Sequence, residues 1–384
     1  MDFALGETQA AVALLAARVL DQGRPPASAP SASARAAPVS SAGLVPGGPA
    51  QAETYDCALW KELGLAGLLS LALPGWLGGD GLGVLDTAVL LTEVGRHAAP
   101  VPALATLALG VLPVMRWGSR DVQQALLAKV AAGETVLTAA LREPSDPMPA
   151  APVTMARWTG GTGTVSGVKI GVPYAAAAAR ILVPASFASG GTGIVIIDPA
   201  ADGVSLRPTH SSAGRPEYTL RLDEVPVTHI LGGGAGDRVV RDLYQLAVAG
   251  ACCLADGALS AALALTTAYV GSREQFGRPL ATFQAVAQQI ADIYVVARTL
   301  HLATVSACWR LETGREAAGD LDVAAYWLAE QAPAALRSCH HLHGGIGMDI
   351  TYPLHRYFAM VKDLVRFVGG ADYRLDQLGA RVSD

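Results

Sequence analysis

The chain has 384 residues, of which 51% are hydrophobic, and a formal net charge of −5. A chain of this length can bury large cores without help from disulfides or metal ions. Its negative charge leaves no broad basic surface for nucleic acid or for an anionic membrane. We therefore expect a small molecule or another protein as the partner.

The cysteines are odd in number, show no CxxC spacing and lie mostly in apolar helical runs, where free cysteine is common: Cys57, Cys252, Cys253, Cys308 and Cys339. Residues 1–7 lack the basic and apolar regions of a secretory signal. Apolar runs at 97–115 and 247–265 approach membrane length, but prolines interrupt the first and Asp256 the second. These features predict a cytoplasmic protein without membrane insertion.

Helical periodicity dominates the first third of the chain. Apolar residues recur at helical spacing over 7–21, 59–71 and 85–96. Between the first two segments, residues 24–52 are rich in proline, alanine and serine and cannot bury enough side chain to offset their ordering entropy. We predict an all-α N-terminal domain over 1–131 with a disordered insertion at 24–52.

The middle of the chain changes to short runs rich in Val, Ile and Thr. Such runs occupy 164–170, 180–183 and 193–197, and Gly, Pro and Asp separate them. This texture is typical of a small antiparallel β domain. We predict a β-barrel or β-sandwich domain over 132–233.

Helical periodicity returns in the last part of the chain. Long segments near 238–271, 280–311 and 321–343 are followed by two shorter ones. Long helices joined by short loops predict an antiparallel four-helix bundle over 234–384. The fold class is therefore α+β, with a helical domain, a β domain and a helical bundle in that order.

Two motifs in the bundle carry functional information. Residues 273–284 read Arg-Glu-Gln-Phe-Gly-Arg-Pro-Leu-Ala-Thr-Phe-Gln, and residues 343–347 read His-Gly-Gly-Ile-Gly. With Leu141-Arg142-Glu143-Pro144 and the three-part order, they resemble the acyl-CoA dehydrogenase family over essentially the whole chain. The resemblance is strongest to the actinobacterial heteromeric type associated with steroid catabolism.

The resemblance implies an FAD-dependent oxidoreductase that acts on an acyl-CoA thioester. In the family, a carboxylate removes the α-proton while the β-hydrogen leaves as hydride to the flavin. Electrons then pass to an electron-transfer flavoprotein or a similar acceptor. The β domain of one subunit cradles the flavin ring, and the C-terminal bundle of its neighbour grips the flavin diphosphate and adenosine.

The positions that serve a neighbour's flavin are kept. Arg273 stands where the family's arginine meets the diphosphate, a role that suits a permanently charged, bidentate side chain. The resemblance assigns FAD contacts to the accompanying positions Gln275, Phe276, Phe283, Gln284, His341, Gly344, Gly345 and Gly347. His341 replaces the usual glutamine and can still donate a hydrogen bond.

Each motif also has an ordinary structural interpretation. A GGxG sequence often ends a helix without binding a ligand, and Arg273 with Glu274 can form a solvated surface pair. The ordered spacing of both motifs within a matching bundle favours the cofactor interpretation.

The positions that serve the chain's own flavin are altered. Arg142 stands where a threonine bonds the flavin ring, and Gly171 replaces an aromatic residue. Pro173 replaces a hydroxyl donor, although proline has neither a side-chain donor nor a backbone N–H. Val368 and Ala247 occupy the two positions of the family's catalytic carboxylate, and neither side chain can accept a proton.

The remaining charged residues give weaker signals. Asp242 and Asp256 are wrongly spaced to replace the missing base. His341 and His343 do not share a helical face, so we assign no metal. We interpret Lys169 and Arg180 as ordinary strand-edge charges.

The leading hypothesis is therefore a subunit that lacks a catalytic base of its own. It would share FAD with a paralogous acyl-CoA dehydrogenase subunit, most simply in an α2β2 assembly. Steroid-derived CoA esters are the substrates that the resemblance suggests. Two alternatives remain: a homomeric active dehydrogenase with an unrecognised base, and a scaffold or regulatory paralogue that binds no flavin.

Overall fold

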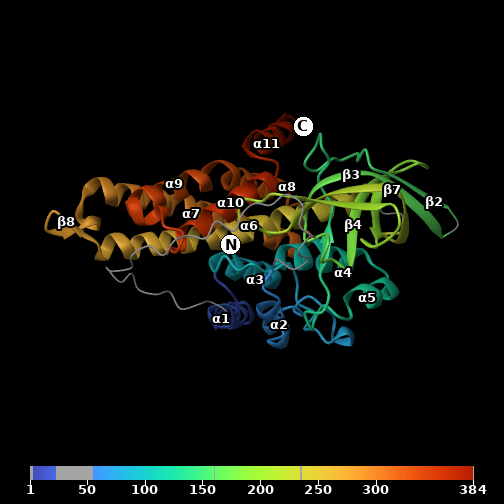
Figure 1. Cartoon of the computed structure of the whole chain (residues 1–384), viewed down its shortest axis with the longest axis horizontal. Helices are drawn as coiled ribbons and strands as arrows, with labels where there is room; N and C mark the ends of the chain where they lie inside the picture. Colours follow the sequence, from blue (N-terminus) through green and yellow to red (C-terminus); the bar gives the residue numbers. More distant parts are fainter. Residues whose placement is uncertain (1–2, 23–54, 160, 234–235, 384) are drawn as a thin grey trace, which may run out of the picture.

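The computed structural model describes residues 3–22, 55–159, 161–233 and 236–383. Helices, strands and helices follow one another along the chain, which confirms the predicted fold class (Figure 1). The tract predicted as a disordered insertion, 24–52, lies outside the described residues. The domain limits at 131/132 and 233/234 stay predictions.

Helices precede the β domain, and one of them, α3, packs closely on the C-terminal bundle. A Cβ on Gly95 of α3 would lie 2.1 Å from the carbonyl oxygen of Leu254, and one on Gly257 would lie 1.9 Å from that of Thr92. Gly257 belongs to α6 (Asp237–Ser272), the first helix of the bundle. Helices α3 and α6 therefore approach closely only because both contact positions are glycine. The helices are α1 (Glu7–Gln22), α2 (Cys57–Leu65), η1 (Gly75–Leu77), α3 (Val84–Arg96), η2 (Leu104–Val111), α4 (Leu112–Trp117) and α5 (Arg120–Leu127).

The β domain is one sheet of seven strands in the order β1-β4-β2-β3-β7-β5, with β6 paired to β7. The strands are β1 (Leu137–Ala139), β2 (Met155–Thr159), β3 (Thr162–Pro173), β4 (Arg180–Phe187), β5 (Thr192–Ile197), β6 (Val204–Thr209) and β7 (Glu217–Leu231). The prediction of an antiparallel domain holds for most strand pairs but is wrong at β4, which runs parallel to both β1 and β2. Long connections rather than hairpins join these pairs, which permits the parallel arrangement.

The C-terminal helices surround α6, which packs against α3, α7, α9 and α10. They are α6 (Asp237–Ser272), α7 (Gln284–Glu312), α8 (Ala318–Tyr326), α9 (Ala332–His343), α10 (Leu354–Phe367) and α11 (Ala371–Ser383), with η4 (Trp327–Gln331) between α8 and α9. Both α6 and α7 are long and apolar enough to cross a membrane, but 83% of the apolar window of α6 is buried, against 22% in α7. The apolar residues of α6 thus form the core, whereas α7 keeps a largely exposed face.

Candidate functional site

The segment after α6 projects from the end of the bundle that lies farthest from the β domain (Figure 1). The backbone N–H of Arg273 ends the helix by donating to the Tyr269 carbonyl at 2.8 Å. Strands β8 (Glu274–Gln275) and β9 (Arg278–Pro279) then form a short hairpin. Phe276 and Gly277 at its tip have φ of 55° and 78°. Two consecutive positive φ values are typical of a type I′ turn, and one of them falls on a bulky residue, which costs conformational energy.

The predicted cofactor residues of this segment face solvent. Phe276 is 92% exposed, and Arg273, Gln275 and Gln284 are also exposed. Phe283 is partly covered by Arg278, whose guanidinium lies 4.1 Å from the ring centroid. Within the described part of the chain Arg273 forms no ion pair, with Glu274 or with any other carboxylate. Its charge is therefore available to an anionic group from outside the chain.

The glycine turn begins where α9 ends. Gly344 has φ 60° and ψ −138°, a conformation that only glycine adopts readily. A Cβ on Gly344 or Gly345 would meet no atom within 4 Å, so this side of the turn is open. On the inner side, Gly347 is close to His340, whose ring Nδ1 lies 3.0 Å from the Gly347 carbonyl oxygen. His341 is exposed beside the turn.

The structure brings the two motifs to the same end of the bundle. His343, which immediately precedes Gly344, stacks on Tyr269 with ring centroids 4.6 Å apart. Tyr269 lies one helical turn before Arg273 on α6. Arg273 and the open glycine turn are thus both exposed at this end of the bundle, where the guanidinium suits a diphosphate.

In the β domain, charged side chains of this chain surround Gly171, one of the positions that the resemblance assigns to the flavin ring. Glu217 at the start of β7 accepts hydrogen bonds from both terminal nitrogens of Arg366, each at 2.5 Å. A Cβ on Gly171 would lie 2.8 Å from Glu217 Oε1 and 3.3 Å from Arg142 Nη1. An aromatic side chain at this position would therefore require Glu217 to move and would strain the backbone, because Gly171 has φ 63°.

The charges of this cluster influence one another. Burial and the nearby charge of Arg366 lower the pKa of Arg142, and Glu217 partly offsets both effects. Hydrogen bonding to Glu217 raises the pKa of Arg366. We call Arg142, Glu217 and Arg366 the internal charge cluster. Without the Glu217 carboxylate, two guanidinium groups would repel each other in a partly desolvated place.

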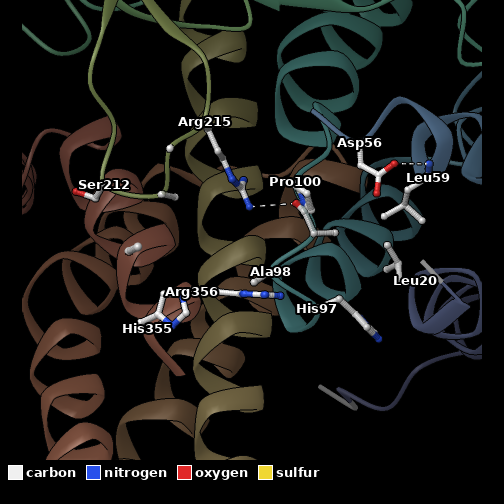
Figure 2. A pocket seen from close by; sticks show the side chains of 14 residues that line it. Leu20, Asp56, Leu59, His97, Ala98, Pro100, Ser212, Arg215, His355 and Arg356 are labelled. Atoms are coloured by element: carbon white, nitrogen blue, oxygen red, sulfur yellow. Dashed lines mark hydrogen bonds between the residues drawn. The ribbon is translucent and has the colours of Figure 1, made fainter. Parts of the chain in front are cut away.

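Asp363 extends the internal charge cluster towards the N-terminal helices. Its carboxylate accepts hydrogen bonds from the backbone amides of Ser212 at 2.7 Å and Ala213 at 2.9 Å. Ser212 and Ala213 border a cavity of about 600 Å³ where the loop after β6, the N-terminal helices and α10 meet. Figure 2 shows Arg215 and Arg356 pointing into this space, and Arg215 donates to the Ala99 carbonyl at 3.1 Å. The loop after β6 therefore forms hydrogen bonds both to α10 and to the N-terminal helical region.

Both predicted base positions are buried and aliphatic. Val368 and Ala247 have no exposed surface, and the Val368 carbonyl accepts a hydrogen bond from Arg374. The two aspartates that we considered as substitutes have other partners. Asp242 bonds the Trp117 indole N–H at 2.7 Å and pairs with Arg116, whereas Asp256 pairs with His301 at 2.8 Å.

A cavity of about 440 Å³ lies between α6, α8 and α11, and its wall includes Arg374, which bonds the Val368 carbonyl. Three carboxylates of its wall accept hydrogen bonds: Asp237 from Thr192, Glu316 from the Ala318 amide, and Asp322 from Arg374 and Arg381. Burial raises the pKa of Tyr373 to about 12 and also raises that of Tyr244, so both phenols stay protonated near neutral pH. Among the described residues that line this cavity, every carboxylate is therefore already engaged.

Lys169 is not the strand-edge charge that the sequence suggested. Its side chain is fully buried, and Nζ lies 2.9 Å from Glu143 Oε1. Glu143 also accepts hydrogen bonds from Val153 N and from the amide and hydroxyl of Thr154. Burial opposes ionisation of Glu143, but the bonds from Thr154 and the charge of Lys169 outweigh it and lower its pKa. Arg180, in contrast, forms a half-exposed pair with Asp198.

Glu217, Asp363, Tyr269 and Tyr352 are site residues that sequence reasoning missed. Glu217 and Arg366 are 149 positions apart, so no local motif connects them. The alternation of β3 was an available signal for Lys169, because it places that residue on the same face as buried Val165.

Comparisons with known proteins identify the family of the chain. Residues 235–382 match the C-terminal domain of acyl-CoA dehydrogenases, and residues 48–134 match the N-terminal domain. Acyl-CoA dehydrogenase FadE28 of Mycobacterium tuberculosis is 47% identical over 326 residues, covering 84% of this chain and 92% of that protein. FadE27 of the same organism is 33% identical over 86% of this chain and 90% of that protein.

Two solved structures of complexes are also similar. A variant of the Tcur3481-Tcur3483 steroid acyl-CoA dehydrogenase has a TM-score of 0.85 and 32% identity over 99% of both chains. The ChsE4-ChsE5 complex of Mycobacterium tuberculosis has a TM-score of 0.86 and 28% identity over 100% of this chain and 99% of that one. On the sequence and family matches, the chain belongs to the acyl-CoA dehydrogenase family.

Proposed function

We propose that this chain is the half-site subunit of a heteromeric, FAD-dependent acyl-CoA dehydrogenase. It presents Arg273 and the glycine turn to a flavin whose ring is cradled by the β domain of a paralogous subunit. When bound there, the flavin accepts the hydride released from the acyl thioester. The partner supplies the carboxylate base, and this chain binds and orients the diphosphate.

The observation that carries the proposal is the contrast between two surfaces. The surface that serves a neighbour is exposed, is open at Gly344 and Gly345, and bears the Arg273 cation, which pairs with no carboxylate of the described residues. The place that would serve the chain's own flavin holds the internal charge cluster, with Glu217 against Gly171. A homomer built from this chain would bring the open surface to a β domain that does not fit the ring.

The base positions favour the same conclusion over a homomeric active enzyme. A general base must reach the α-proton with a free lone pair. Val368 and Ala247 offer none. Among the carboxylates that line the nearby cavity, Asp322 is held by Arg374 and Arg381. A homomeric enzyme would therefore have to use Asp237 or Glu316, which accept hydrogen bonds at one carboxylate oxygen.

The relatives support the choice of partner. The similar structures are complexes of two differently named chains, and one is described as a steroid acyl-CoA dehydrogenase. We extend this to an α2β2 assembly of this chain with a paralogous dehydrogenase, acting on a steroid-derived CoA ester in the cytoplasm. An electron-transfer flavoprotein or a similar acceptor would reoxidise the shared FAD. The exposed apolar face of α7 provides area for such an assembly.

Substitution of Arg273 in the co-expressed complex tests the proposal. A charge-assisted contact is worth about 1.5–3 kcal/mol, so Arg273→Ala should weaken FAD binding by roughly 10- to 100-fold. Arg207→Ala, which removes an exposed arginine on β6, is the matched control and should change nothing. Unchanged FAD affinity in Arg273→Ala would refute the shared site and favour a scaffold without flavin.

A further inference from the structure

Three aromatic rings join the two flavin-facing motifs at their bases. Tyr269 on α6 stacks on His343 at the end of α9 with a 19° angle between the rings. Tyr352, in the connection to α10, also contacts this imidazole, with its ring centroid 5.2 Å from that of His343. We call Tyr269, His343 and Tyr352 the ring triad.

Hydrogen bonds fix the orientation of the central imidazole. His343 Nδ1 lies 2.8 Å from the Cys339 carbonyl oxygen, which can only accept, so Nδ1 carries the proton. Nε2 is then an acceptor for the Tyr352 hydroxyl at 2.9 Å. Burial lowers the pKa of His343 and raises that of Tyr352, so both groups stay neutral and the bond keeps this direction.

Each ring belongs to a different part of the exposed surface. The Tyr269 carbonyl holds the Arg273 amide at 2.8 Å, and the Arg273 carbonyl in turn accepts from Leu280 N at 2.9 Å. His343 directly precedes Gly344, and Tyr352 follows the turn and donates its amide to the Asp349 carbonyl at 3.0 Å. The triad is therefore positioned to transmit a displacement of α9 to the arginine on α6.

The outer residues of both motifs have little packing of their own. Arg273, Phe276, Gly344 and Gly345 are exposed, whereas His343 is only 2% exposed. A diphosphate that contacts both motifs needs the arginine and the turn at a fixed separation, and small errors in such geometry reduce affinity strongly. The buried His343 ring is the contact between α6 and α9 that lies nearest to both motifs along the chain.

We propose that the ring triad is a positioning unit, with His343 as its central residue, that holds Arg273 and the glycine turn in register for the flavin diphosphate. This inference rests on the proposed function. None of the three rings is proposed to contact the cofactor, so their effect acts through the separation between Arg273 and the glycine turn.

The test uses the co-expressed complex and measures the dissociation constant for FAD of its apo form. His343→Phe keeps a ring in the stack but removes both hydrogen bonds, and should raise the constant about tenfold. Tyr352→Phe removes one hydroxyl and should raise it roughly fivefold. Tyr326→Phe on α8 is the matched control and should leave it unchanged.

A double-mutant cycle separates positioning from a general structural effect. If His343 acts by placing Arg273, adding His343→Phe to Arg273→Ala should raise the dissociation constant by less than about twofold further. Full additivity of the two losses would overturn the positioning role. Size-exclusion chromatography checks assembly, and Tyr352→Phe keeps the test available if His343→Phe does not assemble.

The outcomes also separate this inference from the proposed function. Loss of FAD affinity in Arg273→Ala with none in His343→Phe and Tyr352→Phe would refute the ring triad and leave the shared site standing. No loss in Arg273→Ala would refute both.

Discussion

Among the described residues, the two ends of the molecule differ in whether their charged side chains are exposed and unpaired or buried and paired. At the far end of the bundle, Arg273 is exposed beside an open glycine turn and pairs with no carboxylate of the described residues. In the β domain, Glu217 pairs with Arg366 beside the partly buried Arg142, and Glu143 with Lys169 forms a buried pair. Arg273 is therefore accessible to an anionic group of another molecule, whereas the charges of these two β-domain pairs are compensated within the chain.

The largest expected effect concerns the buried pair in the β domain. Lys169→Met leaves Glu143 ionised and buried without its cation, and removing one partner of such a pair costs about 3–5 kcal/mol. We expect the free energy of unfolding of the complex to fall by this amount in chemical denaturation. Arg180→Met breaks only the half-exposed pair with Asp198 and should cost less than about 1 kcal/mol. Equal losses would show that the buried pair is not special.

A smaller effect is expected from crowding the internal charge cluster. Gly171 has φ 63°, and a methyl group there would press on Glu217. Gly171→Ala should therefore cost about 1–3 kcal/mol from backbone strain and displacement of the carboxylate. Gly78→Ala adds a methyl group at φ 77° with no atom within 4 Å, so it isolates the backbone contribution. Equal losses of stability in both variants would show that Glu217 does not crowd the space beside Gly171.

Acid should weaken the two regions at different pH values. Burial lowers the pKa of His343 and of His340 below the ordinary value of about 6.5. Their unfolded forms then bind protons more readily, so stability near the glycine turn declines as pH falls below about 6.5. Glu143, whose pKa is lowered from an ordinary value of about 4.3, loses its contribution only at more acidic pH. Hydrogen exchange compared between neutral and mildly acidic pH should show α9 opening first, and the reverse order would contradict this assignment.

The smallest effect concerns restoration of a base. Val368→Glu places a carboxylate at the position that the family resemblance assigns to the base, but the internal charge cluster remains where we propose that a flavin ring would lie. We expect no measurable dehydrogenation by the isolated variant, with Val368→Gln as the isosteric control. Substantial turnover would show that the ring site accepts a flavin after all.

The fold and the exposed motifs were predictable from the sequence, because both depend on local patterns. Helical periodicity placed α6 and α7 to within a few residues, and the resemblance singled out the two motifs whose bases meet where Tyr269 stacks on His343. The parallel pairing of β4 was not predictable from texture, since pairing is decided by long connections. Glu217 and Arg366 were missed for the same reason, although the unusual Arg142 and Gly171 pointed to the place where they meet.

Flavin stoichiometry is the most direct test of the central claim. The chain would be purified alone and together with a paralogous acyl-CoA dehydrogenase subunit, and bound FAD and subunit ratio would be measured on each. The account predicts a colourless protein alone and one FAD per pair of unlike chains in the complex. A yellow homomer with one FAD per chain that oxidises an acyl-CoA thioester would contradict it.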